Sequence, residues 1–366
     1  MMKKNLSLKH RRILTSGLLS LIFFSSSSIF TFSKESQAIL PTPEDQISIT
    51  PPDAPALESP KMKWAPSDKA KDPSVVYFDN SFFLYFSVPP QVIDGKSYGW
   101  TIGVAKSNNL TDWEYVKNIL PEQDCTQQGL CAPCAKVFDD TVFLFYQTYG
   151  NGAKDAICVS SSNDGINFTH NPNNPIFRPH GEWTNERAID ADVVTFKGKT
   201  FLYAATRDAN GQIQKLTVAS TSLSPEEFIS SRPQDWVQGA DFSILEPELP
   251  WETKCIEAPS VICRNDKLNM FYAGGYNNDP QHVGVAVSND GITWQRLWNI
   301  PFITNGPSGQ WNASESGHPG IFEDPNGQTW LFFQGNNTHG KDWYLSRVKI
   351  DWITTQGIEA PAVVNE

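Results

Sequence analysis

The segment DPSVVYF, residues 72–78, is followed after three residues by the aromatic and aliphatic run FFLYFS, residues 82–87. β-Branched and aromatic residues dominate both segments, and such residues favour β-strands. Related pairs of segments recur four more times along the chain. This repetition decides the fold class.

The five copies keep a nearly constant spacing. Aligned on one anchor position, they are separated by 60, 58, 68 and 60 residues, and the second run follows its anchor by 11 residues in four copies and by 12 in the last. The first segments are DPSVVYF (72–78), APCAKVF (132–138), DADVVTF (190–196), APSVIC (258–263) and HPGIF (318–322). The anchors are Pro73, Pro133, Ala191, Pro259 and Pro319, and the second runs centre on Leu84, Leu144, Leu202, Met270 and Leu331.

Each copy continues with further strand candidates, such as GWTIGVAKS at 99–107 and HVGVAVS at 282–288, and no stretch shows sustained helical periodicity. Three or four short strands in each of five units predict an all-β protein, a five-bladed β-propeller. A β-sandwich has a similar strand content, but it does not require a regular repeat of this length.

Residues 1–38 have the features of an export signal. Basic residues between Lys3 and Arg12 precede an apolar stretch, and Ser36-Gln37-Ala38 fits the pattern that a signal peptidase accepts. An uncleaved membrane anchor is the alternative. Residues 39–66, rich in Pro, Ser and Asp, are expected to form an exposed linker, and residues 67–366 the propeller domain.

The charge of the chain limits its partners. Residues 1–38 hold six Lys or Arg and one acid, so the remainder has a formal charge of −16. A protein this acidic binds polyanions poorly, which argues against nucleic acid as a partner.

We expect a monomer that is secreted, to the extracellular space or the periplasm, with no stable membrane association after signal cleavage.

Six cysteines all lie after residue 38, and an even number in an exported protein suggests disulfides. Fifteen pairings are possible, and the sequence does not choose among them. Cys131 and Cys134 have the spacing of a redox or zinc pair, but no second pair of this kind accompanies them.

Ionisable residues stand at the start of the first strand in four of the five units. These are Asp72 in blade one, Asp190 in blade three, Glu257 in blade four and His318 in blade five. The innermost strands of a propeller line its channel, so these side chains are expected to converge, and repulsion and burial then separate the pKa values of the carboxyl groups. Glycoside hydrolysis needs one protonated and one ionised carboxyl group. Asp192 is an alternative to Asp190.

The motifs KDPSV (71–75), AIDADV (188–193) and IEAPSV (256–261), in this order and spacing, resemble glycoside hydrolase family 43 over about residues 66–355. The resemblance implies a propeller enzyme that removes arabinofuranosyl or xylosyl units from a carbohydrate with inversion. It also implies that Asp72 is the general base, that Glu257 is the general acid, and that Asp190 raises the pKa of Glu257 and positions it.

The resemblance also concerns binding residues. His318 matches a histidine that many members place on the channel axis, sometimes beside a bound calcium or sodium ion. It is therefore a candidate for substrate or metal binding, although the chemistry itself needs no cofactor. Trp183 and Trp311 precede two anchors on loops expected at the channel mouth, and with Arg187 they are candidates for substrate binding. Cys131 departs from the family pattern, because a tryptophan is usual there, and its absence removes a sugar-stacking surface. Ala191 likewise replaces a usual proline.

Two other functions fit the same scaffold. A retaining fructosidase of the related families 32 and 68 would use the blade-one Asp as nucleophile, but Lys71 and the segment IDAD (189–192) differ from the Asn-Asp-Pro-Asn and Arg-Asp-Pro sequences expected there. A non-catalytic sugar-binding propeller predicts the loss of at least one carboxylate, whereas all three are present.

Overall fold

The structure is a computed structural model that describes residues 70–276, 279–355 and 358–364. The predicted signal and linker, residues 1–66, lie outside this range. None of the helices in the described residues has both the length and the apolar character needed to cross a membrane.

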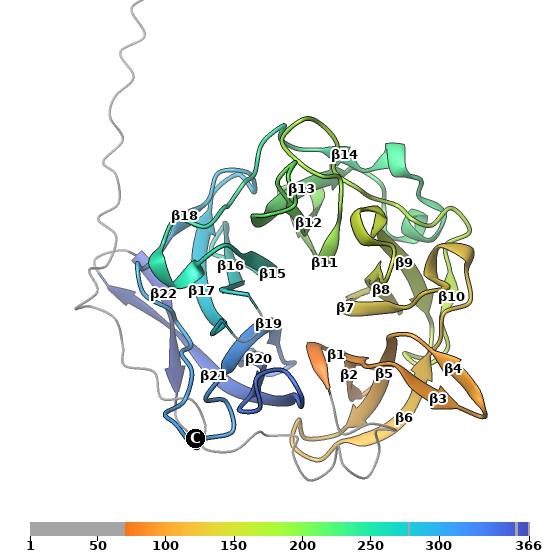
Figure 1. Cartoon of the computed structure of the whole chain (residues 1–366), viewed down its shortest axis with the longest axis horizontal. Coiled ribbons are helices and arrows are strands. Elements are labelled where there is room, and N and C mark those ends of the chain that lie inside the picture. The colour runs from red at the N-terminus through yellow and green to blue at the C-terminus, as the bar shows by residue number, and fades with distance from the viewer. Residues whose placement is uncertain (1–69, 277–278, 356–357, 365–366) are drawn as a thin grey trace, which may run out of the picture. The chain divides into compact units, whose positions relative to one another are not determined.

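Five four-stranded sheets surround a central axis in the order of the sequence (Figure 1). The predicted five-bladed β-propeller is therefore confirmed. In every blade the strand that comes first in the sequence is the innermost one. From the inside outward, the strands are β1 (Lys71–Phe78), β2 (Ser81–Val88), β5 (Thr101–Ser107) and β6 (Glu114–Ile119) in blade one; β7 (Leu130–Phe138), β8 (Thr141–Thr148), β9 (Ile157–Ser162) and β10 (Thr169–His170) in blade two; β11 (Ile189–Phe196), β12 (Lys199–Arg207), β13 (Gln214–Thr221) and β14 (Val237–Gln238) in blade three; β15 (Ile256–Arg264), β16 (Lys267–Gly274), β17 (His282–Ser288) and β18 (Gln295–Arg296) in blade four; and β19 (Glu315–Glu323), β20 (Thr329–Asn336), β21 (Tyr344–Thr355) and β22 (Ile358–Val364) in blade five.

Short elements connect these strands. A two-stranded ribbon of β3 (Gln91–Ile93) and β4 (Lys96–Tyr98) extends from blade one. Short 3-10 helices lie in the loops: η2 (Asp124–Thr126), η3 (Gly152–Lys154), η4 (Pro225–Ser230), η5 (Pro233–Asp235) and η6 (Pro250–Glu252).

The hairpin formed by the first two strands keeps one register in all blades. The residue two positions after the anchor pairs with the centre of the second run, as Val75 does with Leu84 and Ile321 with Leu331. The extra residue of the fifth copy is accommodated in the turn 324–328, between β19 and β20.

Each innermost strand contains a β-bulge at the same position. The residue just before the anchor has a left-handed backbone, with φ of 54° at Asp72, 48° at Ala132, 52° at Asp190, 49° at Ala258 and 44° at His318. Residues other than glycine rarely adopt this conformation, and a bulge bends its strand and re-aims the side chains around it. The bulge therefore redirects the first residues of each inner strand relative to a regular strand.

Side chains of one blade bind the backbone of the next. Three such hydrogen bonds run from the N–H of Ala135 to Ser74 Oγ (2.9 Å), from that of Val261 to Asp192 Oδ2 (2.7 Å) and from that of Ile321 to Ser260 Oγ (2.9 Å). Between blades five and one the equivalent position is Gly320, where a Cβ atom would lie 2.2 Å from the carbonyl oxygen of Pro73. The ring therefore closes through a direct approach of two backbones that only glycine permits.

Apolar side chains fill the spaces between neighbouring blades. The described residues form five buried clusters, one at each junction. Blade five takes all four strands from the C-terminal part of the chain, so the cluster that joins it to blade one, with Val75, Phe82, Trp330 and Phe332, closes the ring without a shared sheet. Burial of each such side chain contributes about 1.5–3 kcal/mol.

All six cysteines are free thiols, in contrast to the predicted disulfides. The Sγ atoms of Cys125 and Cys158 lie 3.9 Å apart. Cys131 and Cys134 flank the bulge of blade two, where Cys134 donates to Asp192 at 3.1 Å. The CxxC spacing thus reflects two positions in one bulged strand.

Asp192 has a structural role that a variant can test. Its Oδ1 lies 2.9 Å from Lys136 Nζ, and its Oδ2 binds the next blade. The Asp192→Ala variant leaves a largely buried ammonium and a backbone N–H unpaired, so we expect it to lower the free energy of unfolding by about 3 kcal/mol in urea denaturation. The exposed Asp140→Ala is the control and should leave stability unchanged. Full stability of Asp192→Ala would contradict this role.

Candidate active site

A cavity of about 140 Å³ lies where the innermost strands begin. A larger cavity of about 430 Å³ lies further along the same strands, and there the carboxylate of Asp192 is already paired with Lys136. The smaller cavity contains the unusual group of ionisable side chains. It is lined by Lys71, Asp72, Trp100, Cys131, Gln147, Tyr149, Arg187, Ile189, Asp190, Glu257, Tyr276 and His318.

The three carboxyl groups singled out in the sequence meet in this cavity together with His318. Asp72, Asp190 and His318 occupy the left-handed position of their bulges, whereas Glu257 stands one residue before it. The additional methylene of the glutamate side chain offsets this shift of one residue.

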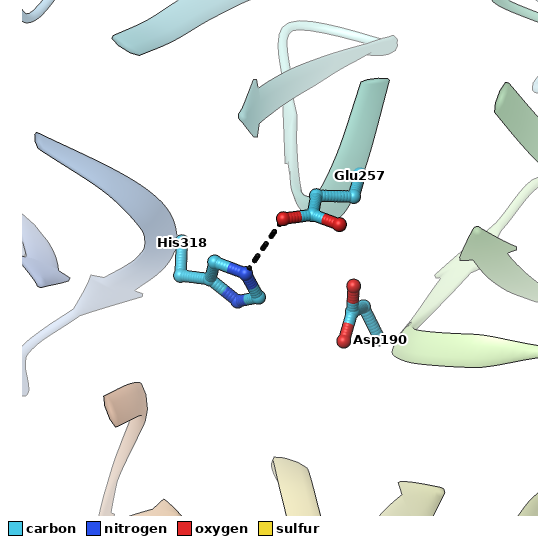
Figure 2. A group of neighbouring side chains, drawn as sticks. All are labelled: Asp190, Glu257 and His318. Carbon is cyan, nitrogen blue, oxygen red and sulfur yellow. Dashed lines mark hydrogen bonds and ion pairs between the residues drawn. The ribbon is translucent and has the colours of Figure 1, made fainter. Parts of the chain in front are cut away.

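His318 contacts two of the three carboxylates. Its Nδ1 lies 2.8 Å from Asp72 Oδ1, and its Nε2 lies 3.1 Å from Glu257 Oε1, the contact drawn in Figure 2. Burial alone would lower the pKa of His318, but the carboxylates of Asp72 and Glu257 raise it well above its usual range. His318 is therefore an imidazolium that bridges two carboxylates.

Both carboxylates that contact His318 are ionised. Burial alone would raise the pKa of Asp72 and of Glu257, but the charge and hydrogen bonding of His318 outweigh it and lower both. Glu257 Oε1 also accepts a hydrogen bond from Gln281 Nε2 at 2.7 Å, and its Oε2 accepts one from Gln214 Nε2.

Asp190 is the carboxyl group that holds its proton. Burial raises the pKa of Asp190 to about 7; His318 opposes this shift, and the charges of Glu257 and Asp72 add to it. Its Oδ2 is buried and has no hydrogen-bond partner among the described residues, as suits a neutral carboxyl group. Its backbone N–H donates to Gln147 Oε1 at 2.8 Å.

The residues around His318 do not suit the calcium or sodium ion expected from the resemblance. Asp190, Glu257 and His318 each offer one atom, and these atoms lie within 4.8 Å of one another (Figure 2). Calcium prefers six to eight oxygen ligands, whereas both nitrogens of His318 already face carboxylates. Ion binding by His318 stays a prediction that this arrangement does not favour.

The other predicted substrate-binding residues take different positions. Arg187 lines the cavity, and its guanidinium lies 3.2 Å from the carboxylate of Asp155. Trp183 lies outside the lining, with the ammonium of Lys215 5.3 Å from its ring centre. Trp311 is buried in the core between blades four and five. Of these three, only Arg187 lines the cavity.

Three aromatic residues that line the cavity were not predicted from the sequence: Trp100, Tyr149 and Tyr276. The rings of Trp100 and Tyr149 lie 5.7 Å apart. Tyr149 and Tyr276 stand just after the second strands of blades two and four. A hairpin brings the end of its second strand beside the start of its first. The sequence could therefore have predicted that Tyr149 and Tyr276 lie near the cavity. These rings provide an aromatic surface beside Cys131.

The channel combines ionised and protonated carboxyl groups with aromatic rings. These are the groups that a glycosidase uses to cleave and to bind a sugar. Comparison with known sequences identifies the family. The sequence profile described as Glycosyl hydrolases family 43 matches residues 66–352, and the chain belongs to this family of glycosidases. No curated protein matches the chain.

Solved structures share the fold at low sequence identity. A thermostable family-43 glycoside hydrolase has a TM-score of 0.62 and 19% identity, with 80% of this chain and 92% of the other covered. An endo-1,4-beta-xylanase from Bacteroides thetaiotaomicron has a TM-score of 0.60 and 18% identity, with 82% of this chain and 97% of the other covered. An alpha-L-arabinofuranosidase from Lactobacillus brevis has a TM-score of 0.59 and 15% identity, with 82% of this chain and 96% of the other covered.

The proton on Asp190 predicts a pH dependence of stability. An unfolded aspartate loses its proton near pH 3.9, whereas folded Asp190 keeps it to about pH 7, so its contribution to stability falls as the pH rises through this range. Asp190→Asn removes this effect. Its melting temperature should exceed that of the wild type at pH 7.5, and the difference should shrink toward pH 4.5, with Asp140→Asn as the control. An equal difference at both pH values would show that the pKa of Asp190 is not raised.

Proposed function

We propose that the chain hydrolyses arabinofuranosyl or xylosyl linkages in oligosaccharides or polysaccharides with inversion at the anomeric carbon. The observation that carries this proposal is the placement of two ionised carboxylates on opposite sides of His318. His318 lies between them, 2.8 Å from Asp72 Oδ1 and 3.1 Å from Glu257 Oε1, so the ring holds the two carboxylates apart, as an inverting reaction requires. Inverting glycosidases need about 6.5–9.5 Å, because a water molecule must enter beside the sugar, and retaining ones about 5–5.5 Å.

Asp72 is the proposed general base. Its lowered pKa keeps it ionised at neutral pH, as a group that accepts a proton from water must be. Its Oδ1 is directed at His318, and its backbone N–H is held by Gln334 Oε1 at 2.9 Å, which fixes the carboxylate relative to the cavity.

Glu257 is the proposed general acid, and Asp190 its proton-holding neighbour. In the free site the pKa of Glu257 is lowered and that of Asp190 is raised, so the proton of the pair resides on Asp190. Two interacting carboxyl groups titrate as a pair, and a bound sugar that displaces water changes the sharing between them. In this proposal substrate binding transfers the shared proton to Glu257, which then delivers it to the leaving oxygen.

The size and lining of the cavity support a small sugar unit. A volume of about 140 Å³ lies below the roughly 300–1,000 Å³ of pockets for drug-sized ligands, so one sugar ring fills it. Trp100, Tyr149 and Tyr276 provide apolar faces for the ring.

The export-signal features of residues 1–38 support action outside the cytoplasm. A monomer is the proposed oligomeric state.

The two alternative functions lead to different measurements. A retaining fructosidase-like reaction first releases the sugar with its starting anomeric configuration, so NMR of the first-formed anomer distinguishes it from inversion. A non-catalytic sugar-binding propeller would bind oligosaccharides and turn over no aryl arabinofuranoside, xyloside or plant polysaccharide.

Leaving-group dependence identifies the acid. We expect Glu257→Gln to lower kcat about 10²–10⁴-fold on an aryl glycoside with a poor leaving group, and much less on one with an activated leaving group that departs without a proton. Asp190→Asn removes the proton that Glu257 receives, so it should also slow the poor leaving group more than the activated one, but by a smaller factor than Glu257→Gln, because Glu257 can still take a proton from water. If Asp190→Asn shows the larger dependence on the leaving group, Asp190 is the acid.

The buried Glu252→Gln variant is the control for this comparison. Glu252 binds Tyr272 and Arg296 away from the cavity, so its substitution should reduce stability without changing the ratio of the two rates.

A further inference from the structure

The ammonium of Lys71 lies at the cavity and has no hydrogen-bond acceptor among the described residues. The residue is only 8% exposed, and it lines the cavity beside Asp72. Its Nζ lies 4.8 Å from the ring centre of Trp343 and 5.7 Å from that of Trp100. Within residues 70–276, 279–355 and 358–364, no oxygen forms a hydrogen bond or a close ion pair with this ammonium. An ammonium has three donors, and the faces of two rings satisfy its charge but not its hydrogen-bonding capacity.

Blade five holds this arrangement in place. The indole N–H of Trp343 donates to Glu315 Oε2 at 3.0 Å, and the other oxygen of Glu315 accepts a hydrogen bond from Gln334 Nε2. Gln334 in turn binds the backbone N–H of Asp72 at 2.9 Å. One buried carboxylate thus positions both the ring under Lys71 and the peptide that carries the proposed base.

The charge of Lys71 is already balanced, so a counter-ion is not what the site lacks. Burial alone would lower the pKa of Lys71, but nearby carboxylates, Asp72 and Glu315 foremost, raise it. The ammonium therefore stays charged in surroundings of compensating charge. The missing element is a neutral oxygen within hydrogen-bonding distance.

We propose that Lys71 is a substrate-binding residue whose ammonium donates a hydrogen bond to one ring hydroxyl of the sugar held beside Asp72. The inference rests on the proposed function and adds the residue that recognises this hydroxyl. A neutral pentose is the matching ligand class. A uronic acid, which presents a carboxylate, would bring a negative charge into a cavity whose charges are already matched.

Deoxy substrates test the assignment. For the aryl glycoside that the wild type hydrolyses best, kcat/KM is measured for the parent and for analogues that lack one ring hydroxyl each. The wild type should lose roughly 10- to 100-fold on the analogue that lacks the Lys71 partner, as for a hydrogen bond to a charged group. Lys71→Met should lower kcat/KM for the parent by a similar factor and lose little more on that analogue.

The comparison is insensitive to poor folding, because parent and analogue are measured on the same sample of each variant. Lys71→Arg, which keeps the charge and donors, should retain part of the discrimination. Lys106→Met removes another lysine that stacks on an aromatic ring, 5.3 Å from the centre of Phe83 and outside the cavity, and should behave as the wild type does.

Three results would overturn the inference. If Lys71→Met loses the same factor in kcat/KM as the wild type on every deoxy analogue, Lys71 does not bind a hydroxyl of the substrate. A wild type that prefers aryl uronides, with the preference lost in Lys71→Met, replaces the hydroxyl with a carboxylate. The second result also changes the sugar class of the proposed function. A wild type that hydrolyses no aryl glycoside and no plant polysaccharide refutes the proposed function itself, which the first result leaves standing.

Discussion

A left-handed bulge at the start of every innermost strand determines how this propeller uses its channel. In a regular strand successive side chains alternate between two faces, so an extra residue changes which of the first side chains face the cavity. The extra residue redirects them in all five blades at once. The strained conformation costs on the order of 1 kcal/mol at each non-glycine residue. Ala132 and Ala258 adopt it without carrying any charge, so the bulge belongs to the fold, and the side chains Asp72, Asp190 and His318 add the chemistry.

The charges gathered by these bulges balance one another. Lys71 and His318 are cations, Asp72 and Glu257 are anions, and Asp190 is neutral below about pH 7, so these five side chains have no net charge despite their density, while Arg187 is paired with Asp155. This balance explains how five ionisable groups tolerate burial in one cavity. It also ties the protonation of Asp190 to the other four, because a second negative charge beside Glu257 would have no partner.

Residues two positions apart on one innermost strand can have different roles, one at the cavity and one in holding the blades together. Asp190 lies at the cavity, whereas Asp192, two residues along the same strand, joins three neighbouring blades through Cys134, Lys136 and the N–H of Val261. Two identical side chains thus have different roles because one lies in the bulge and the other follows it. At the last junction Gly320 replaces such a side chain, and the backbones of blades five and one come into contact instead.

The fold and the main carboxylates could be predicted from the sequence because a propeller repeats itself. The spacing between Pro73 and Pro319 reports five equivalent strands, and residues at equivalent positions occupy equivalent places around the axis. The positions of Asp72, Asp190, Glu257 and His318 follow from that symmetry. The expectation that nucleic acid is not a partner rests on charge, and charge is a property of composition.

The loops and the protonation states do not repeat, and only the tertiary structure decided them. Trp311 was expected at the channel mouth but is packed in the core, while Trp100, Tyr149 and Tyr276 line the cavity. Six cysteines suggested disulfides, yet the fold leaves their thiols free. Asp190, rather than Glu257, holds the proton of the free site, because burial and distances of a few ångströms set a pKa. Repetition in the sequence determines where strands lie around an axis, but contacts between segments far apart in the chain determine which side chain meets which.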